Sequence, residues 1–176
     1  AYLRTQYIHL MTNQPPKKHN LPGTLTVGSI IGGTYRVIDF VGAGGMGYVY
    51  KVEHLMMAKV MAPKVLRADE VSPAVWSRFR IEAKAIARLD HPNVVRIYDM
   101  NQTEEGTPYY TMDLLAGQSL ADYLDANGPM PPALALPVFT QVCVGLAYAH
   151  ERGIIHRDIK PGNIMLTGVG GGGARR

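Results

Sequence analysis

The run from His156 to Asn163, His-Arg-Asp-Ile-Lys-Pro-Gly-Asn, constrains this chain more than any other feature of its sequence. It places a carboxylate, an ammonium group and an amide in one short segment. Asp158 can accept the proton of an attacking hydroxyl, Lys160 can neutralise charge on a moving phosphoryl group, and Asn163 can ligate a metal ion through its amide oxygen. The run therefore indicates phosphoryl transfer, and the plain alternative is a polar loop between a helix and a strand.

A glycine-rich segment far upstream has the pattern G-x-G-x-x-G, from Gly42 to Gly47, with Val49 two residues beyond it. Dinucleotide-binding turns share this pattern, but there the glycines open a helix. Here valines and tyrosines follow Gly47 and favour a strand, and Tyr35–Val41 before the glycines also predicts a strand. The segment therefore predicts a hairpin whose backbone can approach phosphates closely. A purely structural hairpin and a dinucleotide-binding oxidoreductase are the alternatives.

Together these two segments resemble the eukaryotic-type protein kinases, whose patterns are H-R-D-x-K-P-x-N and G-x-G-x-x-G-x-V. The resemblance runs from about Tyr35 to Leu166, with the motifs in the order that the family has. A lysine two residues after Asp158 resembles the serine/threonine kinases rather than the tyrosine kinases. The residue identities in both motifs are most similar to those of the bacterial eukaryotic-like (Hanks-type) kinases.

The resemblance identifies Lys64 as the third-strand lysine that holds the α- and β-phosphates of ATP. Pro63 stands where a branched residue is usual, and proline cannot donate to a sheet ladder. We therefore expect Pro63 at an irregular or unpaired point of its strand. Lys59 is the alternative lysine.

Glu82 lies on the apolar stripe of a helix predicted over Arg78–Leu89. A carboxylate on that stripe should be paired. The resemblance implies that it is the helix-C glutamate that pairs with Lys64. An ordinary glutamate on the helix surface is the alternative.

The resemblance also implies a nucleotide pocket. Met112 would be the gatekeeper, and Asp113 and Leu115 would offer hinge backbone groups to the adenine. Val49 and Ala62 would lie above the base and Met165 below it, although each of these could be plain core. The segment expected over the phosphates consists of Val41, Gly42, Ala43, Gly44, Gly45, Met46 and Gly47.

The implied fold class is α+β and protein-kinase-like: a five-stranded antiparallel N-lobe with helix C, then the first part of a helical C-lobe. We expect a short helix capped by Ser119 and a long helix over Ala133–Glu151. The expected divisions are a flexible tail over 1–33, the N-lobe and hinge over 34–115, a partial C-lobe through the catalytic loop over 116–167, and a Gly-rich tail over 168–176.

The function implied is transfer of phosphoryl groups from ATP, with Mg²⁺, to serine or threonine hydroxyls of proteins. Kinases carry D-F-G about a dozen residues beyond the catalytic-loop asparagine, and its aspartate holds magnesium. The 176 residues contain no D-F-G, so we expect a truncated fragment that is inactive as it stands. The alternative is a non-catalytic remnant that binds nucleotide or a partner.

Composition narrows the remaining possibilities. A net charge of +4 without a basic stripe interleaved with aromatic residues does not favour nucleic acid as a partner. The single cysteine, Cys143, argues against a disulfide framework, and we expect a buried thiol. The sequence contains no run of about 18 apolar residues, so it predicts no membrane segment. We expect a cytoplasmic protein, and many bacterial relatives carry a membrane helix after the kinase domain.

The long helix predicted over Ala133–Glu151 is apolar nearly all round, so it requires burial on several faces. In a complete kinase, later helices of the C-lobe would cover its far side. We therefore expect exposed apolar side chains in this fragment, among them some of Val138, Phe139, Val142 and Leu146.

Overall fold

The computed structural model describes residues 4–7, 25–44, 47–67 and 72–167. By their contacts these residues form two compact units. The first, called here the sheet unit, comprises the described residues of 25–88 and 96–114. The second, called here the helical unit, comprises residues 4–7, 89–95 and 115–167. Gly45, Met46 and the expected tail over 168–176 lie outside the described residues.

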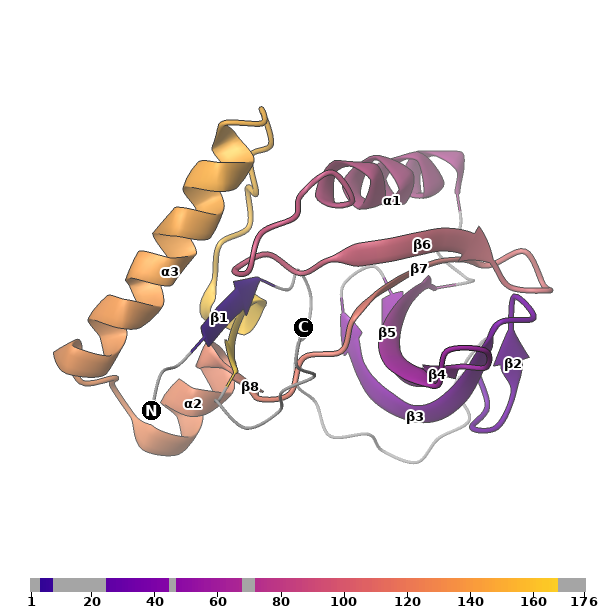
Figure 1. Ribbon diagram of the computed structural model, residues 1–176, viewed down its shortest axis with the longest axis horizontal. Coiled ribbons are helices and arrows are strands. Elements are labelled where there is room, and N and C mark those ends of the chain that lie inside the picture. Colours follow the sequence, from indigo (N-terminus) through magenta and orange to yellow (C-terminus); the bar gives the residue numbers. More distant parts are fainter. Residues whose placement is uncertain (1–3, 8–24, 45–46, 68–71, 168–176) are drawn as a thin grey trace. The chain divides into compact units, whose positions relative to one another are not determined.

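The sheet unit is built on one antiparallel sheet (Figure 1). Its strands are ordered β2-β3-β4-β5-β7-β6. Their bounds are Ile30–Ile31 for β2, Tyr35–Gly44 for β3, Gly47–His54 for β4, Lys59–Leu66 for β5, Ile97–Gln102 for β6 and Pro108–Asp113 for β7. The five long strands match the expected N-lobe sheet, and the two-residue strand β2 adds a sixth at the edge.

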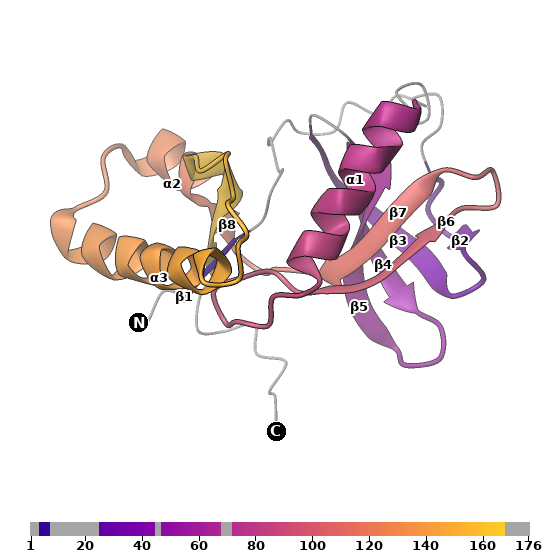
Figure 2. The same ribbon diagram turned by 90° about the horizontal axis from the view of Figure 1, so that it is seen from above.

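One helix, α1 over Pro73–Ile86, belongs to the sheet unit and is seen from above in Figure 2. Pro73 occupies its first turn, and the Ser72 side chain accepts a hydrogen bond from the Val75 N–H at 3.3 Å. This cap explains why the helix begins before Arg78, the first residue expected to be helical. The side chains of Phe79 and Ala83 are buried, so one stripe of α1 packs inward.

The two faces of the sheet differ in what they bury, because side chains alternate along each strand. One face carries the main apolar cluster of the unit, which includes Tyr50, Val52, Met61, Val65 and Tyr109. The residues between these positions, among them Ala62, Lys64, Tyr110 and Met112, point to the opposite face. Strand alternation thus places the predicted lysine and the predicted gatekeeper on one surface.

The helical unit combines two helices with a small sheet. The helices are α2 over Leu120–Asn127 and α3 over Pro132–His150, and a 3₁₀ turn spans Pro161–Asn163. The sheet has the order β1-β9-β8, with bounds Arg4–Tyr7, Ile164–Thr167 and Gln118–Ser119 respectively. Its core is an apolar cluster of Leu120, Val138, Val142, Ile164 and Leu166.

Ser119 caps α2 as expected. Its hydroxyl accepts from the Asp122 N–H at 3.0 Å, and the Asp122 carboxylate accepts from the Ser119 N–H at 3.2 Å. This reciprocal pair is a capping box and fixes where the helix begins. The long helix α3 agrees with the expected span to within one residue at each end.

The structure departs from the expected N-terminal tail over 1–33 at two places. Arg4–Tyr7 forms β1, which pairs antiparallel with Ile164–Thr167. Residues 25–33 are described as well, and Ile30–Ile31 pairs with β3. Both segments are held by hydrogen bonds to other strands, and local composition does not reveal such partners.

Residues 89–95 belong to the helical unit, although they were expected to fall in the N-lobe. The Tyr148 hydroxyl accepts a hydrogen bond from the Asp90 N–H at 3.3 Å, and the Asn93 amide donates to Gln141 at 3.2 Å. Gly145 allows this approach, because a Cβ there would lie 3.2 Å from the Asn93 Cβ. These contacts to α3 attach the segment to the helical unit.

By length and hydropathy alone, α3 is the one helix among the described residues that could cross a membrane, with 19 residues and a mean hydropathy of 1.5. Two of its side chains, Val138 and Val142, are nevertheless buried in the apolar cluster of the helical unit. Within the described part of the chain, 22% of the apolar window of this helix is buried. Cys143, expected to be buried, is exposed, because it lies on the side of α3 away from that cluster.

Candidate active site

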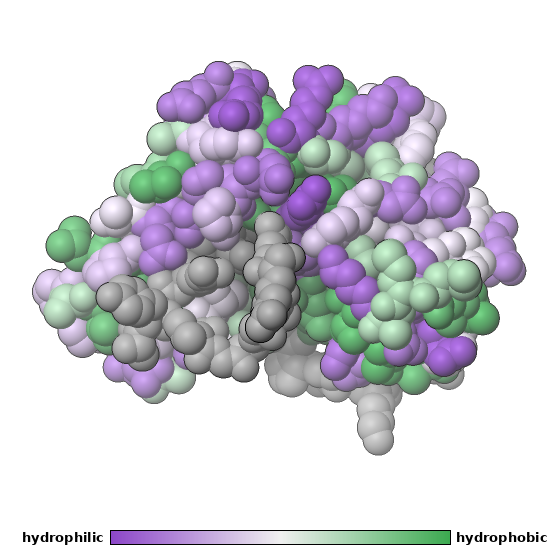
Figure 3. Space-filling model, viewed as in Figure 1, coloured by the Kyte–Doolittle hydropathy of each residue, from purple (hydrophilic) through white to green (hydrophobic). Residues whose placement is uncertain are grey.

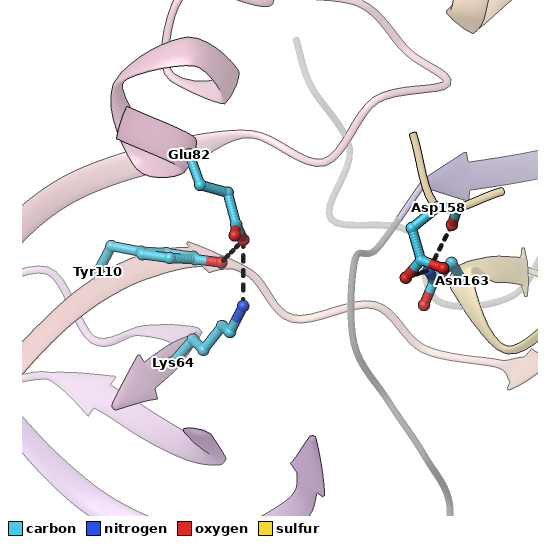
Figure 4. A network of polar contacts seen from close by, with 5 residues as sticks. All are labelled: Lys64, Glu82, Tyr110, Asp158 and Asn163. Atoms are coloured by element: carbon cyan, nitrogen blue, oxygen red, sulfur yellow. Dashed lines mark hydrogen bonds and ion pairs between the residues drawn. The ribbon is translucent and has the colours of Figure 1, made fainter. Parts of the chain in front are cut away.

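Lys64 and Glu82 form an ion pair inside the sheet unit (Figure 4). The Lys64 Nζ lies 3.1 Å from the Glu82 Oε1. The lysine comes from β5 and is 0% exposed, and the glutamate comes from the inward side of α1 and is partly buried. The pair therefore joins the sheet to its helix, as the sequence predicted.

Burial governs the ionisation of this lysine. Desolvation lowers the pKa of Lys64 below the ordinary value of 10.5, and the charge and hydrogen bond of Glu82 act in the opposite direction. The rings of Tyr110 and Phe79 also face the ammonium, at 5.5 Å and 5.9 Å from Nζ to the ring centroids. An aromatic face attracts a cation and offsets part of its lost hydration.

Pro63 lies at an interruption of the sheet, as expected. The pairing of β5 with β4 runs from Gly47 with Leu66 to Val49 with Lys64, and resumes at Val52 with Met61. Pro63 falls in the gap between these pairs and keeps its register with Thr111 on the β7 side. The missing N–H is thus accommodated on the side of β4.

Lys59, the alternative lysine, begins β5 and does not join the pair with Glu82. Its Nζ lies 3.8 Å from the centroid of the Tyr98 ring, and residue 59 is exposed. The geometry therefore favours Lys64 for the internal ion pair.

The described glycines of the segment lie on two strands, Gly42 and Gly44 at the end of β3 and Gly47 at the start of β4. The two strands are paired as far as Gly44 with Gly47, with irregularities between Val37 and Asp39 and between Phe40 and Gly42. A Cβ at Gly47 would collide with the Val65 carbonyl oxygen on β5. Glycine is required at position 47, because a side chain there would collide with the neighbouring strand.

The residues expected around an adenine lie in both units. In the sheet unit, Ala62 on β5 is the direct cross-strand partner of Met112 on β7, and both are buried. Val49 is buried on β4 and paired with Lys64. In the helical unit, Leu115 is partly buried and Met165 on β9 is buried.

Asp113, the last residue of β7, is held by hydrogen bonds through both its backbone and its side chain. Its N–H donates to the Arg96 carbonyl oxygen at 3.1 Å, and its carboxylate accepts from the Tyr98 hydroxyl at 2.6 Å. Asp113 is therefore fixed by contacts within the sheet unit at the position predicted to be the hinge.

Within the run from His156 to Asn163, the side chains of Asp158 and Asn163 contact each other (Figure 4). The Asn163 amide nitrogen donates to the Asp158 backbone carbonyl at 2.8 Å and to its Oδ2 at 3.1 Å. Lys160 Nζ lies 2.9 Å from the same Oδ2, and the Asp158 N–H donates to His156 Nδ1 at 3.3 Å. The three side chains selected from the sequence thus meet at one carboxylate.

Burial and backbone conformation differ along this loop. Asn163 is buried, whereas the side chains of Asp158 and Lys160 are 39% and 47% exposed. Arg157 has φ of 65°, in the left-handed region that residues other than glycine rarely adopt. Such conformations persist where the surroundings hold them, and they concentrate at functional loops.

Tyr110 was not selected from the sequence, yet it contacts the ion pair between Lys64 and Glu82. Its hydroxyl donates to the same Glu82 Oε1 at 3.2 Å. Strand alternation offered a signal, because Tyr110 lies two residues before Met112 and therefore on the same face. Its contact with α1 could not be predicted from that pattern.

The donor set suits a magnesium ion that arrives with phosphates. Mg²⁺ prefers oxygen ligands and takes one or two from the protein, the others coming from phosphates and water. Asn163 turns its amide nitrogen to Asp158, so its amide oxygen is the atom of that side chain able to ligate a cation. Among the described residues, no group of three or more histidine, cysteine or acidic side chains forms a cage for a metal.

An antiparallel sheet with a buried lysine–glutamate pair, followed along the chain by a loop that gathers an aspartate, a lysine and an asparagine, is the arrangement of residues found in the protein kinase family. The sequence model of the protein kinase domain matches residues 35–170. The chain belongs to the protein kinase family.

The relatives are bacterial serine/threonine-protein kinases. The chain is 39% identical over 147 residues to PrkC of Bacillus subtilis, and the match covers 83% of this chain and 22% of that protein. It is 41% identical over 141 residues to pkn3 of Myxococcus xanthus, and the match covers 80% of this chain and 26% of that protein. The chain thus spans about a quarter of the curated relatives it matches.

A solved structure agrees in fold. The crystal structure of the PknI kinase domain of Mycobacterium tuberculosis superposes with a TM-score of 0.71 at 32% identity, covering 82% of this chain and 58% of that one. The expected fold class, α+β and protein-kinase-like, is confirmed.

Proposed function

We propose that the protein binds ATP with Mg²⁺ and transfers the γ-phosphoryl group to serine or threonine hydroxyls of proteins. The observation that carries this proposal is the buried ion pair between Lys64 and Glu82. In protein kinases this pair must be in place for catalysis, because the lysine aligns the phosphates.

The nucleotide would be held by the sheet unit. The glycine segment over residues 41–47 would cover the phosphates. The Lys64 ammonium would contact the α- and β-phosphates, while Val49, Ala62 and Met112 would offer an apolar surface to the adenine. Backbone groups of Asp113 and Leu115 would complete the hinge, with Met165 as a further contact to the base.

The loop of the helical unit would act on the hydroxyl and the moving group. Asp158 would accept the hydroxyl proton and orient its oxygen for in-line attack. Lys160, already 2.9 Å from the Asp158 carboxylate, would carry positive charge next to the transferred phosphoryl group. Asn163 would fix Asp158 through its amide nitrogen and ligate magnesium through its amide oxygen, and the metal would supply charge neutralisation at the phosphates.

The 176-residue chain by itself is proposed to bind nucleotide without turning it over. Its sequence holds no D-F-G, whose aspartate is the main magnesium ligand in kinases. The alternative is a remnant whose role is nucleotide or partner binding without chemistry. Transfer from labelled ATP to a generic protein substrate decides this point, and turnover that Asp158→Asn abolishes would show that the chain is active as it stands.

The nucleotide site is tested by two lysine variants on one strand. Titration calorimetry with Mg·ATP should show saturable binding to the unmodified chain. Lys64→Met should weaken it by roughly tenfold or more, since a contact to a charged group is lost. Lys59→Met, at the other end of β5, should bind as the unmodified chain does.

The unfolding midpoint of each variant serves as the control for folding. An apolar side chain in place of a buried charge is often tolerated, so Lys64→Met should remain folded. Equal affinities of the two lysine variants would refute the assignment of Lys64.

Two further expectations belong to the proposal. Protein substrates with serine or threonine are proposed as partners, in line with the relatives' names. We propose a cytoplasmic location for this domain, where ATP is available.

A further inference from the structure

Tyr110 supplies a second hydrogen-bond donor to Glu82, the glutamate of the ion pair with Lys64. Its hydroxyl and the Lys64 ammonium both reach Glu82 Oε1, at 3.2 Å and 3.1 Å. Figure 4 shows the two side chains approaching the carboxylate from neighbouring strands. Glu82 thus has two independent partners, one charged and one neutral.

The tyrosine ring is held firmly for this contact. Tyr110 is 2% exposed and is the direct cross-strand partner of Lys64. The ring of Phe79, one turn before Glu82 on α1, lies 4.9 Å from the Tyr110 ring, centroid to centroid. The hydroxyl is therefore aimed at the carboxylate by packing on both the sheet and the helix.

We propose that Tyr110 is a positioning residue, whose hydroxyl holds the Glu82 carboxylate, and through it helix α1, turned toward Lys64. A lysine that contacts phosphates shares its ammonium between the nucleotide and Glu82. The tyrosine hydroxyl donates to Glu82 Oε1 at 3.2 Å, so it keeps Glu82 in place while Lys64 engages the ligand. This consequence for nucleotide binding rests on the proposed function, whereas the hold on α1 does not.

Burial also keeps the donor in its protonated form. Desolvation, together with the negative charge of Glu82, raises the pKa of Tyr110 well above 10.0. The hydroxyl therefore stays protonated at neutral pH and can donate to Glu82.

The adjacent tyrosine provides a matched control. Tyr109 lies on the same strand with its side chain on the other face, and its buried hydroxyl has no hydrogen-bond partner within the described part of the chain. Tyr109→Phe and Tyr110→Phe thus remove the same atom from neighbouring buried sites. One of these hydroxyls reaches Glu82 and the other does not.

The direct test is amide hydrogen exchange over α1, residues 73–86, in the 176-residue chain without nucleotide. Tyr110→Phe should speed exchange by roughly tenfold, the usual order for a hydrogen bond to a charged group. Tyr109→Phe should leave it unchanged. Exchange over α1 that is equal in the two variants would overturn the proposal.

A double-variant cycle separates positioning from general packing. With Glu82→Leu the acceptor is gone, and adding Tyr110→Phe should change exchange over α1 by less than about twofold, because coupled residues act non-additively. A full tenfold effect in the Glu82→Leu background would mean that the hydroxyl acts through something other than Glu82, and would overturn the proposal.

Titration with Mg·ATP adds the functional readout. Tyr110→Phe should weaken affinity by about threefold or more, while Tyr109→Phe should not. If the unmodified chain shows no saturable binding, the proposed function fails, and exchange over α1 still decides the role of Tyr110. If ATP binds equally well to Tyr110→Phe while exchange over α1 rises, the link to nucleotide binding is refuted.

Discussion

A fully buried lysine is costly to keep, and Lys64 shows what offsets that cost. The desolvation penalty for a buried ion is on the order of several kcal/mol. A buried ion pair often stabilises a fold no better than apolar residues of the same volume would. Here the Glu82 carboxylate and two aromatic faces compensate for the lost water. A charge retained at such expense next to a glycine hairpin indicates a functional site.

The ionisation of Lys64 gives a prediction at the residue scale. The pKa of Lys64 should lie below 10.5, and Glu82→Gln should lower it further, because Glu82 raises it. Nuclear magnetic resonance of a lysine-labelled chain measures both values. A pKa that rises in Glu82→Gln would contradict the assigned role of Glu82.

The same depressed pKa has a consequence for stability with a definite sign. In the unfolded chain Lys64 keeps its proton up to about pH 10.5, near its ordinary value. Between its folded pKa and that value the unfolded state binds more protons, so this residue makes the free energy of unfolding rise with pH. Lys64→Met should remove that contribution, which unfolding in denaturant at two alkaline pH values can measure.

Much of the candidate site at this scale was predictable from sequence. Motif spacing selected Lys64, Glu82 and the three polar residues of the 156–163 loop, and the structure brings each set together. Their roles in catalysis remain predictions. Tyr110 was not predicted, because its contact with Glu82 depends on the position of α1. The prediction that the Cys143 thiol is buried was wrong, because the sequence of a nearly all-apolar helix does not reveal which side packs against the core.

At the scale of elements, the glycine hairpin is shaped by a neighbouring strand. Gly47 is the cross-strand partner of Leu66 on β5, and a Cβ at Gly47 would collide with the neighbouring Val65 carbonyl oxygen. A Cβ at Gly42, in the same motif, would have nothing within 4 Å, and Gly42 has no positive φ. The two glycines therefore serve different purposes within one pattern.

Alanine substitutions should separate these purposes. Gly47→Ala should lower the free energy of unfolding by about 1–3 kcal/mol, the usual cost of overpacking. Gly42→Ala should change it by less than about 0.5 kcal/mol. Chemical denaturation of both variants tests this, and equal losses would show that the close contact at Gly47 is not the cause.

The elements that sequence reasoning placed best carry local signals. The serine predicted to cap α2 forms a capping box with Asp122 and fixes the start of that helix. For α1, Ser72 and Pro73 carry the start signal, but the helix was expected only from Arg78, so its first turn was missed. Strand β1 had no such signal. Arg4–Tyr7 is a strand because it pairs with Ile164–Thr167 near the other end of the chain, and a partner so distant is not visible in local composition.

At the scale of the whole molecule, the surface of the helical unit stands out for its apolar side chains. Several residues of α3 are exposed, namely Leu134, Leu136, Phe139 and Val144. Figure 3 shows hydrophobic residues in green among polar ones on the visible face of this unit, at the left. Of the four side chains named from the sequence as candidates for exposure, Phe139 is about half exposed, Leu146 is partly buried, and Val138 and Val142 are buried.

This contrast along one helix predicts different effects of the same substitution. Val138→Ala, at a fully buried site, should cost about 2 kcal/mol in the free energy of unfolding. Leu136→Ala, at a site that is 72% exposed, should cost less than about 0.5 kcal/mol and should reduce binding of a dye for apolar surface. Denaturation and dye fluorescence of both variants check this, and strong destabilisation by Leu136→Ala would refute the assigned orientation of α3.

The central claim is that the face of the sheet unit carrying Lys64 binds a nucleotide. The most direct measurement is mapping of backbone amide chemical shifts during titration with Mg·ATP. We expect saturable changes in β4, β5 and β7 around Val49, Lys64 and Met112, and their loss in Lys64→Met. Saturable binding that leaves these strands unchanged, or no saturable binding at all, would contradict the claim.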